Sequence, residues 1–275
     1  MKLGRTSHAR RCVTRLSAGL VLVLAAGCAT TPETNQNEDP DRYYRLGQIL
    51  LVNGELDKAE YWLKKSEAIK ADDPLLQNLL GLLYWGRGRR EHGELAAMRQ
   101  YEIAVPHLKR ALELDPTFTK AENNLGVCLA DMKRDDEAVE HFEHVLADRN
   151  YPTPEKVHNN VAVLYVRKGD TKKAIEHYKA AIDYQPSFIP ARLGLGKLYY
   201  EMGRNGDAHR TFDAALQIQK KLPEAHYYIG LLFLRDGQGA IAKAAFEEAI
   251  RLSDNDTEVN REARKHLAAL RGVGG

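Results

Sequence analysis

The chain has 275 residues, of which 44% are hydrophobic and 28% charged, with 21 glycines, 10 prolines and 3 cysteines. This composition excludes a collagen-like chain and a disulfide scaffold, and it supplies enough apolar material for a folded core. The net charge is +2, but residues 1–27 hold five basic and no acidic side chains, which leaves 35 basic against 38 acidic in residues 28–275. Such a body lacks the basic surface that binds nucleic acid, so we expect no nucleic-acid partner.

Residues 1–27 are predicted to be an export signal. Basic side chains come first, the apolar run AGLVLVLAA occupies residues 18–26, and a small residue follows at Gly27. A basic region, an apolar region and a small-residue cleavage site are typical of a secretory signal. The apolar run is too short to cross a bilayer, which needs about 20 residues.

The residues before Cys28, Leu24-Ala25-Ala26-Gly27, resemble a bacterial lipobox, although Ala25 stands where an aliphatic residue is usual. The resemblance implies that this segment is a lipoprotein signal peptide and that Cys28 carries a covalent lipid as the mature N-terminus. It also implies an anchor on the periplasmic face of the outer membrane, because Ala29 is not Asp. The alternative is an ordinary signal peptide. Residues 28–40 are polar and are predicted to be a flexible, lipidated tether. We expect no other cofactor.

The remaining cysteines need no disulfide. Cys12 would be removed with the signal and Cys28 would be modified, so Cys128 would be the single thiol of the mature chain. Apolar residues flank Cys128, and we interpret it as a buried small side chain and not as a nucleophile.

One helical unit recurs six times between residues 41 and 254. Each unit has a small residue followed twelve positions later by an alanine, or 23 later in the second unit, and the small residues lie 34, 45, 36, 34 and 34 apart. A period near 34 indicates a solenoid. Small residues allow two helices to cross closely. These residues are Gly47 with Ala59, Gly81 with Ala104, Gly126 with Ala138, Ala162 with Ala174, Gly196 with Ala208, and Gly230 with Ala242.

The unit resembles the tetratricopeptide repeat, whose first helix reads W-x₂-L-G-x₂-Y and whose second reads A-x₃-F. The fourth unit shows the match best, with His158, Val161, Ala162 and Tyr165 followed by Ala174, Tyr178 and Ala181. The resemblance implies an all-α fold, a right-handed α-solenoid of six helix pairs over residues 41–254. Residues 255–275 are predicted to be a capping helix and tail that cover the last pair.

The second repeat carries eleven extra residues around positions 86–98. Eleven residues complete three helical turns, so longer helices could absorb them, but Gly86, Gly88 and Gly93 favour a projecting loop or a broken helical finger. Pro106 is predicted to kink the second helix. The arginines Arg87, Arg89 and Arg90 are interpreted as a solvated loop, with a contact to acidic lipid headgroups or to a partner as the alternative.

The sequence contains no motif of catalysis. It lacks His-Glu-x-x-His, Gly-x-Ser-x-Gly, a Walker loop and Cys-x-x-Cys, so we expect neither an enzyme nor a small-molecule substrate. His141 and His144 would share one helix face and could form half of a metal site. No third ligand is close in the sequence, so we interpret them as a surface pair and expect no metal.

The exposed side of the first helices is the predicted partner-binding groove, because stacked helix pairs curve around these helices. Side-chain amides offer a donor and an acceptor for a peptide backbone. In peptide-binding tetratricopeptide repeats an Asn before the Leu-Gly pair does this, and Asn124 and Asn160 occupy that position. The alternative is that the amides bond only to neighbouring helices. The candidate groove residues are Asn123, Asn124, Lys156, Asn159, Asn160, Arg167, Lys197, Tyr200, Tyr227, Tyr228 and Leu231.

The order of lipobox, short tether and six repeats resembles the type IV pilus pilotin lipoproteins (PilF/PilW and Tgl-like). Residues 150–156, NYPTPEK, followed by Asn159 and Asn160, resemble the Tyr-Pro segment found there between repeats three and four. The resemblance implies an outer-membrane scaffold that binds a secretin and promotes its membrane targeting and multimerisation in type IV pilus assembly. The alternative is a general periplasmic tetratricopeptide-repeat lipoprotein that serves as an adaptor for envelope or cell-wall enzymes.

Overall fold

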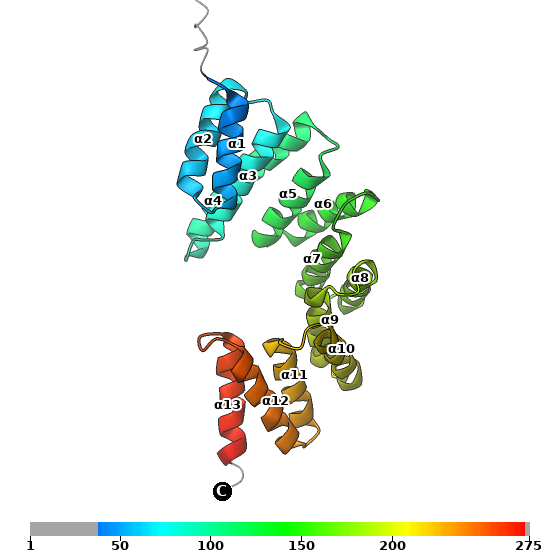
Figure 1. The fold of residues 1–275 in the computed structure, drawn as a ribbon. Coiled ribbons are helices and arrows are strands. Elements are labelled where there is room, and N and C mark those ends of the chain that lie inside the picture. Colours follow the sequence, from blue (N-terminus) through cyan, green and yellow to red (C-terminus); the bar gives the residue numbers. More distant parts are fainter. Residues whose placement is uncertain (1–37, 273–275) are drawn as a thin grey trace, which may run out of the picture. The chain divides into compact units, whose positions relative to one another are not determined.

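The computed structural model describes residues 38–272, which form helices joined by turns and, within that range, no strand. Twelve helices form six antiparallel pairs in chain order and a thirteenth follows (Figure 1). The predicted all-α solenoid of six pairs with a capping helix is therefore confirmed. The predicted signal, Cys28 and most of the tether lie outside the described residues. The helices are α1 Pro40–Val52, α2 Leu56–Ile69, α3 Pro74–Gly88, α4 Glu94–Leu114, α5 Thr119–Asp131, α6 Asp135–Ala147, α7 Pro154–Arg167, α8 Thr171–Tyr184, α9 Ile189–Glu201, α10 Asn205–Ile218, α11 Pro223–Arg235, α12 Gly239–Leu252 and α13 Glu258–Gly272.

An aspartate and a proline fix the start of α1 and of α3. The Asp39 carboxylate accepts hydrogen bonds from the backbone N–H groups of Asp41 and Arg42, at 3.0 and 3.1 Å. Asp73 caps α3 in the same way. A proline at the first helical position has no N–H that would need a partner there. Local sequence therefore fixes where these two first helices begin.

The turn between the two helices of a pair needs a left-handed residue. It falls seven positions after the repeated small residue, where Gly54, Gly169, Gly203 and Gly237 have φ between 72° and 78°. Lys133 holds the same place in the third pair with φ 62°. Glycine adopts this conformation without steric cost, whereas Lys133 is strained. The second helix of each pair can then run back along the first.

The second pair departs from this pattern. Gly88 stays helical, and a Cβ built on it would lie 2.3 Å from the ring of Tyr101. The second helix, α4, begins ten residues before Ala104, whereas α6 begins three residues before Ala138. The insertion therefore adds about two turns to α4. The segment is not a projecting loop, because Gly88 serves a close helix contact. The chain turns at residues 89–93 between α3 and the lengthened α4, which is closer to the broken helical finger that the sequence also favoured.

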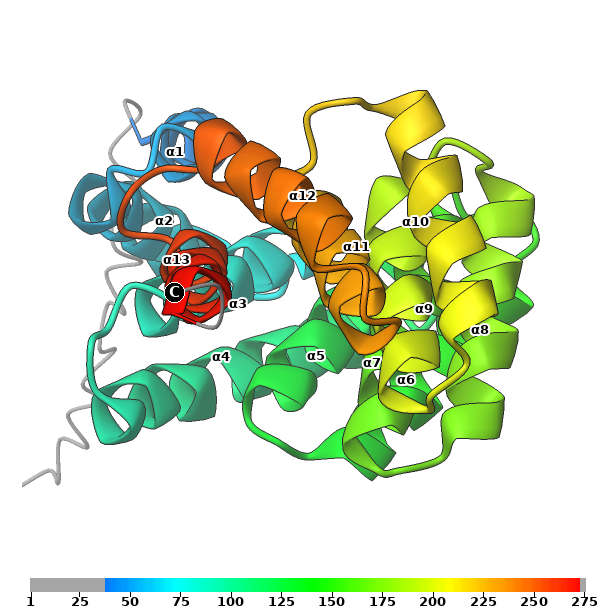
Figure 2. The same cartoon turned by 90° about the horizontal axis from the view of Figure 1, so that it is seen from below.

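The repeated small residues lie under large side chains of the second helix. A Cβ on Gly126 would lie 2.9 Å from Phe142, and one on Gly196 would lie 2.7 Å from Phe212. The paired alanines are fully buried. One core runs through the stack, and a smaller cluster joins the last pair to α13, which contacts α11 and α12 (Figure 2). The predicted cap thus covers the apolar face of α12.

Candidate protein-binding surface

The first helices of successive pairs contact one another along the stack. Contacts join α1 to α3, and then α5, α7, α9 and α11 in turn, whereas among residues 38–272 no second helix contacts the next second helix to a comparable extent. The first helices therefore lie on the narrower side of the stack. We call the exposed side of α1, α3, α5, α7, α9 and α11 the first-helix face.

Side-chain amides form a row on this face across α3, α5 and α7. The Asn124 Nδ2 donates to the Asn78 Oδ1 of the preceding pair at 2.8 Å, so this amide is used between helices. The Oδ1 of Asn159 is buried and has no hydrogen-bond partner. Asn123 and Asn160 are half-buried beside them. The amides therefore fall into two groups. Asn124 bonds to a neighbouring helix, whereas the Asn159 side chain has an acceptor without a partner.

A hollow of about 180 Å³ lies between α5 and α7. Asn160 and Arg167 line it together with the apolar side chains of Val127 and Val163. The Arg167 guanidinium donates to the carbonyl of Ala130 at 3.0 Å and also pairs with Asp135. Arg167 thus already has a carboxylate partner, and it ties the third pair to the fourth.

The two predicted lysines differ from Arg167. Lys156 and Lys197 are both exposed. Near Lys197, burial raises the pKa of Glu224, and the positive charge of Lys197 partly opposes that rise. The ammonium groups of Lys156 on α7 and Lys197 on α9 are therefore open to solvent.

Tyrosine rings make a continuous apolar patch over α9 and α11. Tyr228 contacts Tyr200 and Tyr227 edge-on, with centroids 5.4 and 5.3 Å apart, and it stacks on Phe212 at 5.3 Å. The guanidinium of Arg235 lies 3.5 Å from the centre of the Tyr200 ring. Burial raises the pKa of Tyr228, so its hydroxyl stays protonated. Leu231 is half-buried on the same helix.

Two residues of the first-helix face escaped the sequence reading. Asn78 lies 45 positions before Asn123, which is the spacing of the second and third repeats, so the register of the insertion was the signal. The indole Nε1 of Trp85 donates to the Asp131 Oδ2 at 2.9 Å and joins α3 to α5. The repeat spacing does not predict that contact.

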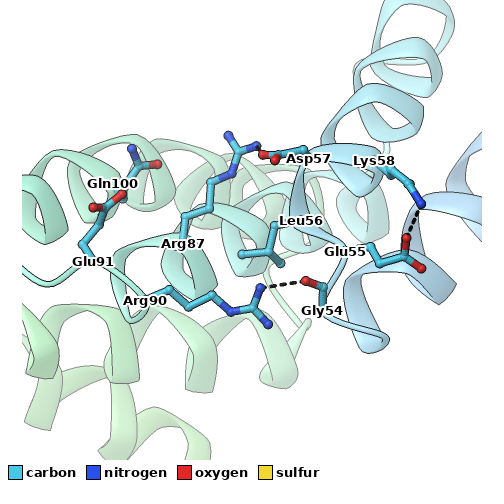
Figure 3. A pocket seen from close by; sticks show the side chains of 9 residues that line it. All are labelled: Gly54, Glu55, Leu56, Asp57, Lys58, Arg87, Arg90, Glu91 and Gln100. Atoms are coloured by element: carbon cyan, nitrogen blue, oxygen red, sulfur yellow. Dashed lines mark hydrogen bonds and ion pairs between the residues drawn. The ribbon is translucent and has the colours of Figure 1, made fainter.

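The arginines of the second repeat are bound within the chain. Arg87 pairs with Asp57 at 2.6 Å and with Glu60 at 2.7 Å. Arg90 donates to the carbonyl of Gly54 at 2.7 Å (Figure 3). Both arginines line a cleft of about 640 Å³ between the first two pairs. Arg87 is therefore not part of a solvated loop, whereas Arg89 and Arg90 lie exposed in the turn after α3, as predicted. The contact to acidic lipid headgroups or to a partner stays a prediction.

Two further side-chain predictions have an outcome. Cys128 is fully buried, and burial raises its pKa to about 12, so the expected small buried side chain is confirmed. The pair His141 and His144 has a third neighbour that the sequence did not show, because Glu122 of α5 reaches both imidazoles.

The fold and this face define a tetratricopeptide-repeat solenoid, a class whose curved stacks present extended binding surfaces to other proteins. Two family models described as tetratricopeptide repeats match residues 117–187 and 165–232. Among named relatives, the type IV pilus assembly protein PilF of Pseudomonas aeruginosa is 25% identical over 198 residues, which cover 67% of this chain and 73% of PilF. The peroxisomal targeting signal receptor of Candida albicans is 35% identical over 104 residues, and the chain spans just 16% of that receptor's length.

Solved structures agree on the fold. PilW, a widely conserved type IV pilus biogenesis factor, superposes with a TM-score of 0.68 at 18% identity over 81% of this chain and 97% of PilW. PilF of Pseudomonas aeruginosa gives 0.67 at 18% identity over 82% of this chain and 96% of PilF. In the described range no helix is both long and apolar enough to cross a membrane.

Proposed function

We propose that the chain is an outer-membrane lipoprotein scaffold, attached through Cys28, whose first-helix face binds a secretin and promotes its targeting and multimerisation in type IV pilus assembly. The observation that carries the proposal is the two-sided match to PilF, in which 67% of this chain aligns with 73% of that assembly protein. The match to the peroxisomal receptor, by contrast, covers 16% of that receptor.

The chemistry of the first-helix face supports an extended peptide as the bound element. A peptide backbone needs alternating donors and acceptors, which the amides of α5 and α7 supply. Asn159 is half-buried and its Oδ1 has no hydrogen-bond partner, so a rotation of the amide that exposes Oδ1 would offer a bound peptide an unused acceptor. Lys156 and Lys197 would hold acidic side chains of the same segment, and the tyrosine rings would hold its apolar ones.

Membrane attachment is tested by replacing Cys28. The Cys28→Ser variant should leave the membrane fraction and lower the amount of secretin multimer in cells, while the chain itself accumulates normally. Multimers at wild-type abundance in a deletion strain would contradict the secretin role. Membrane-bound Cys28→Ser protein would contradict the lipid anchor.

Partner binding is tested by cross-linking in intact cells. A photo-crosslinking amino acid at Lys197, on α9, should capture the secretin. The same amino acid at Lys172, an exposed lysine on the second helix α8, is the matched control and should not. Capture of cell-wall hydrolases at Lys197, without secretin, would replace the proposal with the adaptor function.

A further inference from the structure

A cluster of three metal-binding side chains lies in the third pair, away from the first-helix face residues discussed above. Glu122 belongs to α5, and His141 and His144 belong to α6. The Glu122 Oε1 lies 2.9 Å from the His141 Nδ1 and 2.8 Å from the His144 Nδ1. The three ligand atoms all lie within 4.8 Å of one another. Both imidazoles therefore converge on one carboxylate oxygen.

Local structure explains the convergence. Residues three apart on a helix lie on one face, so His141 and His144 point in the same direction from α6. Their ring planes are nearly perpendicular, at 86°, with centroids 6.4 Å apart. The Glu122 side chain is 13% exposed and held from the facing helix, while that of His144 is 74% exposed. The carboxylate is fixed inside, and one ligand faces water.

We propose that Glu122, His141 and His144 bind one zinc ion, with water in the fourth position. Two imidazole nitrogens and one carboxylate oxygen are a set that zinc uses in tetrahedral sites that keep one position open. Bond lengths of about 2.0 to 2.2 Å place tetrahedral ligands about 3.3 Å apart, so small side-chain rotations suffice to admit the ion.

Space for the fourth ligand is present next to the cluster. A cleft of about 210 Å³ is lined by Pro116, Thr117, Thr119, Glu122 and His144. Thr119 anchors its rim by donating from Oγ1 to the Asp148 Oδ2 at 3.0 Å. A water bound to the metal would find hydroxyl and carbonyl partners there.

Equivalent positions in neighbouring pairs supply an internal comparison. In the second pair, Gln77 Oε1 faces His107 Nδ1 at 2.7 Å, and in the fourth, His158 faces His177 at 3.0 Å. Glu67 also lies 3.9 Å from His107 Nδ1, so the second-pair cluster holds one imidazole, one carboxylate and an amide, which is a weak zinc ligand. Within residues 38–272 the third pair alone brings three such ligands together.

Zinc binding is measured on the untagged full-length chain by competition with a chromophoric chelator at pH 7.5. The wild type should bind one zinc ion that His144→Ala and Glu122→Gln weaken at least about tenfold, since each loses one of three ligands. His177→Gln is the control and should bind as the wild type does. Cobalt bound to the wild type should give the intense visible absorption of a tetrahedral site, and His144→Ala should lose it.

His144 is exposed, so its removal leaves the fold intact and the result stays interpretable. Equal zinc affinity in the wild type and His144→Ala would overturn the proposal, as would equal competition by magnesium, which prefers oxygen ligands.

Discussion

His158 and His177 face each other inside the fourth pair with their Nδ1 atoms 3.0 Å apart. Both rings also stack on tyrosines, His158 on Tyr184 at 5.4 Å and His177 on Tyr165 at 5.6 Å. Two imidazoles this close can share one proton, but they cannot both be charged without repulsion. The groups that face this pair include Glu143, Glu176 and Lys173.

This pair makes stability depend on pH. Burial, and then the charge of His177, lowers the pKa of His158 to about 4, and burial lowers the pKa of His177. Since the unfolded pKa is about 6.5, the unfolded chain takes up protons first as the pH falls. The contribution of this pair to the free energy of unfolding is therefore fully present above about pH 6.5 and is lost as the pH falls towards 4. We expect a loss of about 1 to 2 kcal/mol, which allows for screening of the half-buried rings by solvent.

The measurement is the thermal midpoint at several pH values, for the wild type and for His158→Gln. The thermal midpoint of the variant should fall less than that of the wild type between pH 6.5 and pH 4. An identical profile would show that other groups control the acid sensitivity.

Gly196→Ala should destabilise the fold by about 1 to 3 kcal/mol through overpacking. The added methyl group would lie 2.7 Å from the Phe212 ring, in a fully buried contact. Gly206→Ala is the matched control in the first turn of α10, where the nearest atom is 3.8 Å away. The control should gain up to about 1 kcal/mol from the better helix former. Denaturant unfolding measures both, and equal effects would contradict the packing argument.

Asn159→Leu should stabilise the isolated chain by about 1 kcal/mol, because it removes a buried acceptor that lacks a partner. The same change should weaken capture of the partner, since it removes a donor and an acceptor from the first-helix face. Asn123→Leu is the control for stability and should give no such gain. Thermal unfolding measures the change in stability, and the yield of cross-linked partner measures binding. A lower stability of Asn159→Leu would contradict the expected gain.

Arg167→Ala should weaken the junction between the third and fourth pairs. Its side chain is 30% exposed and that of Asp135 is 18% exposed, so the pair is partly shielded from water. A double-mutant cycle with Asp135→Asn should give a coupling of about 1 to 2 kcal/mol. Arg167→Lys should not restore it, because a lysine cannot serve Asp135 and the Ala130 carbonyl together. Additive single effects would count against this bridge.

The repeat period was enough to predict the helix pairs, since small residues such as Gly126 and alanines such as Ala138 recur wherever two helices cross closely. The insertion was misread because Gly88 was taken as a loop glycine, whereas it makes room for the Tyr101 ring. Whether a glycine serves a turn or a contact depends on what packs on it, which local sequence does not state.

The site was predicted less well than the fold because its contacts join different helices, either of neighbouring repeats or of one pair. Asn124 bonds to Asn78, 46 residues away, and Glu122 reaches the two histidines from the other helix of its pair. Such pairs follow from the register of stacked helices, so only a repeat-by-repeat alignment could show them. The return of histidine at His107, His141 and His177 was the available signal.

The division of the first-helix face into amides over α5 and α7 and tyrosine rings over α9 and α11 has a geometric consequence. A segment laid along it in one sense would set its polar residues against amides and its apolar residues against rings. The reversed segment would bury polar groups on aromatic carbon, which is costly. The surface can therefore distinguish the N-to-C sense of a segment whose polar and apolar residues are grouped at opposite ends.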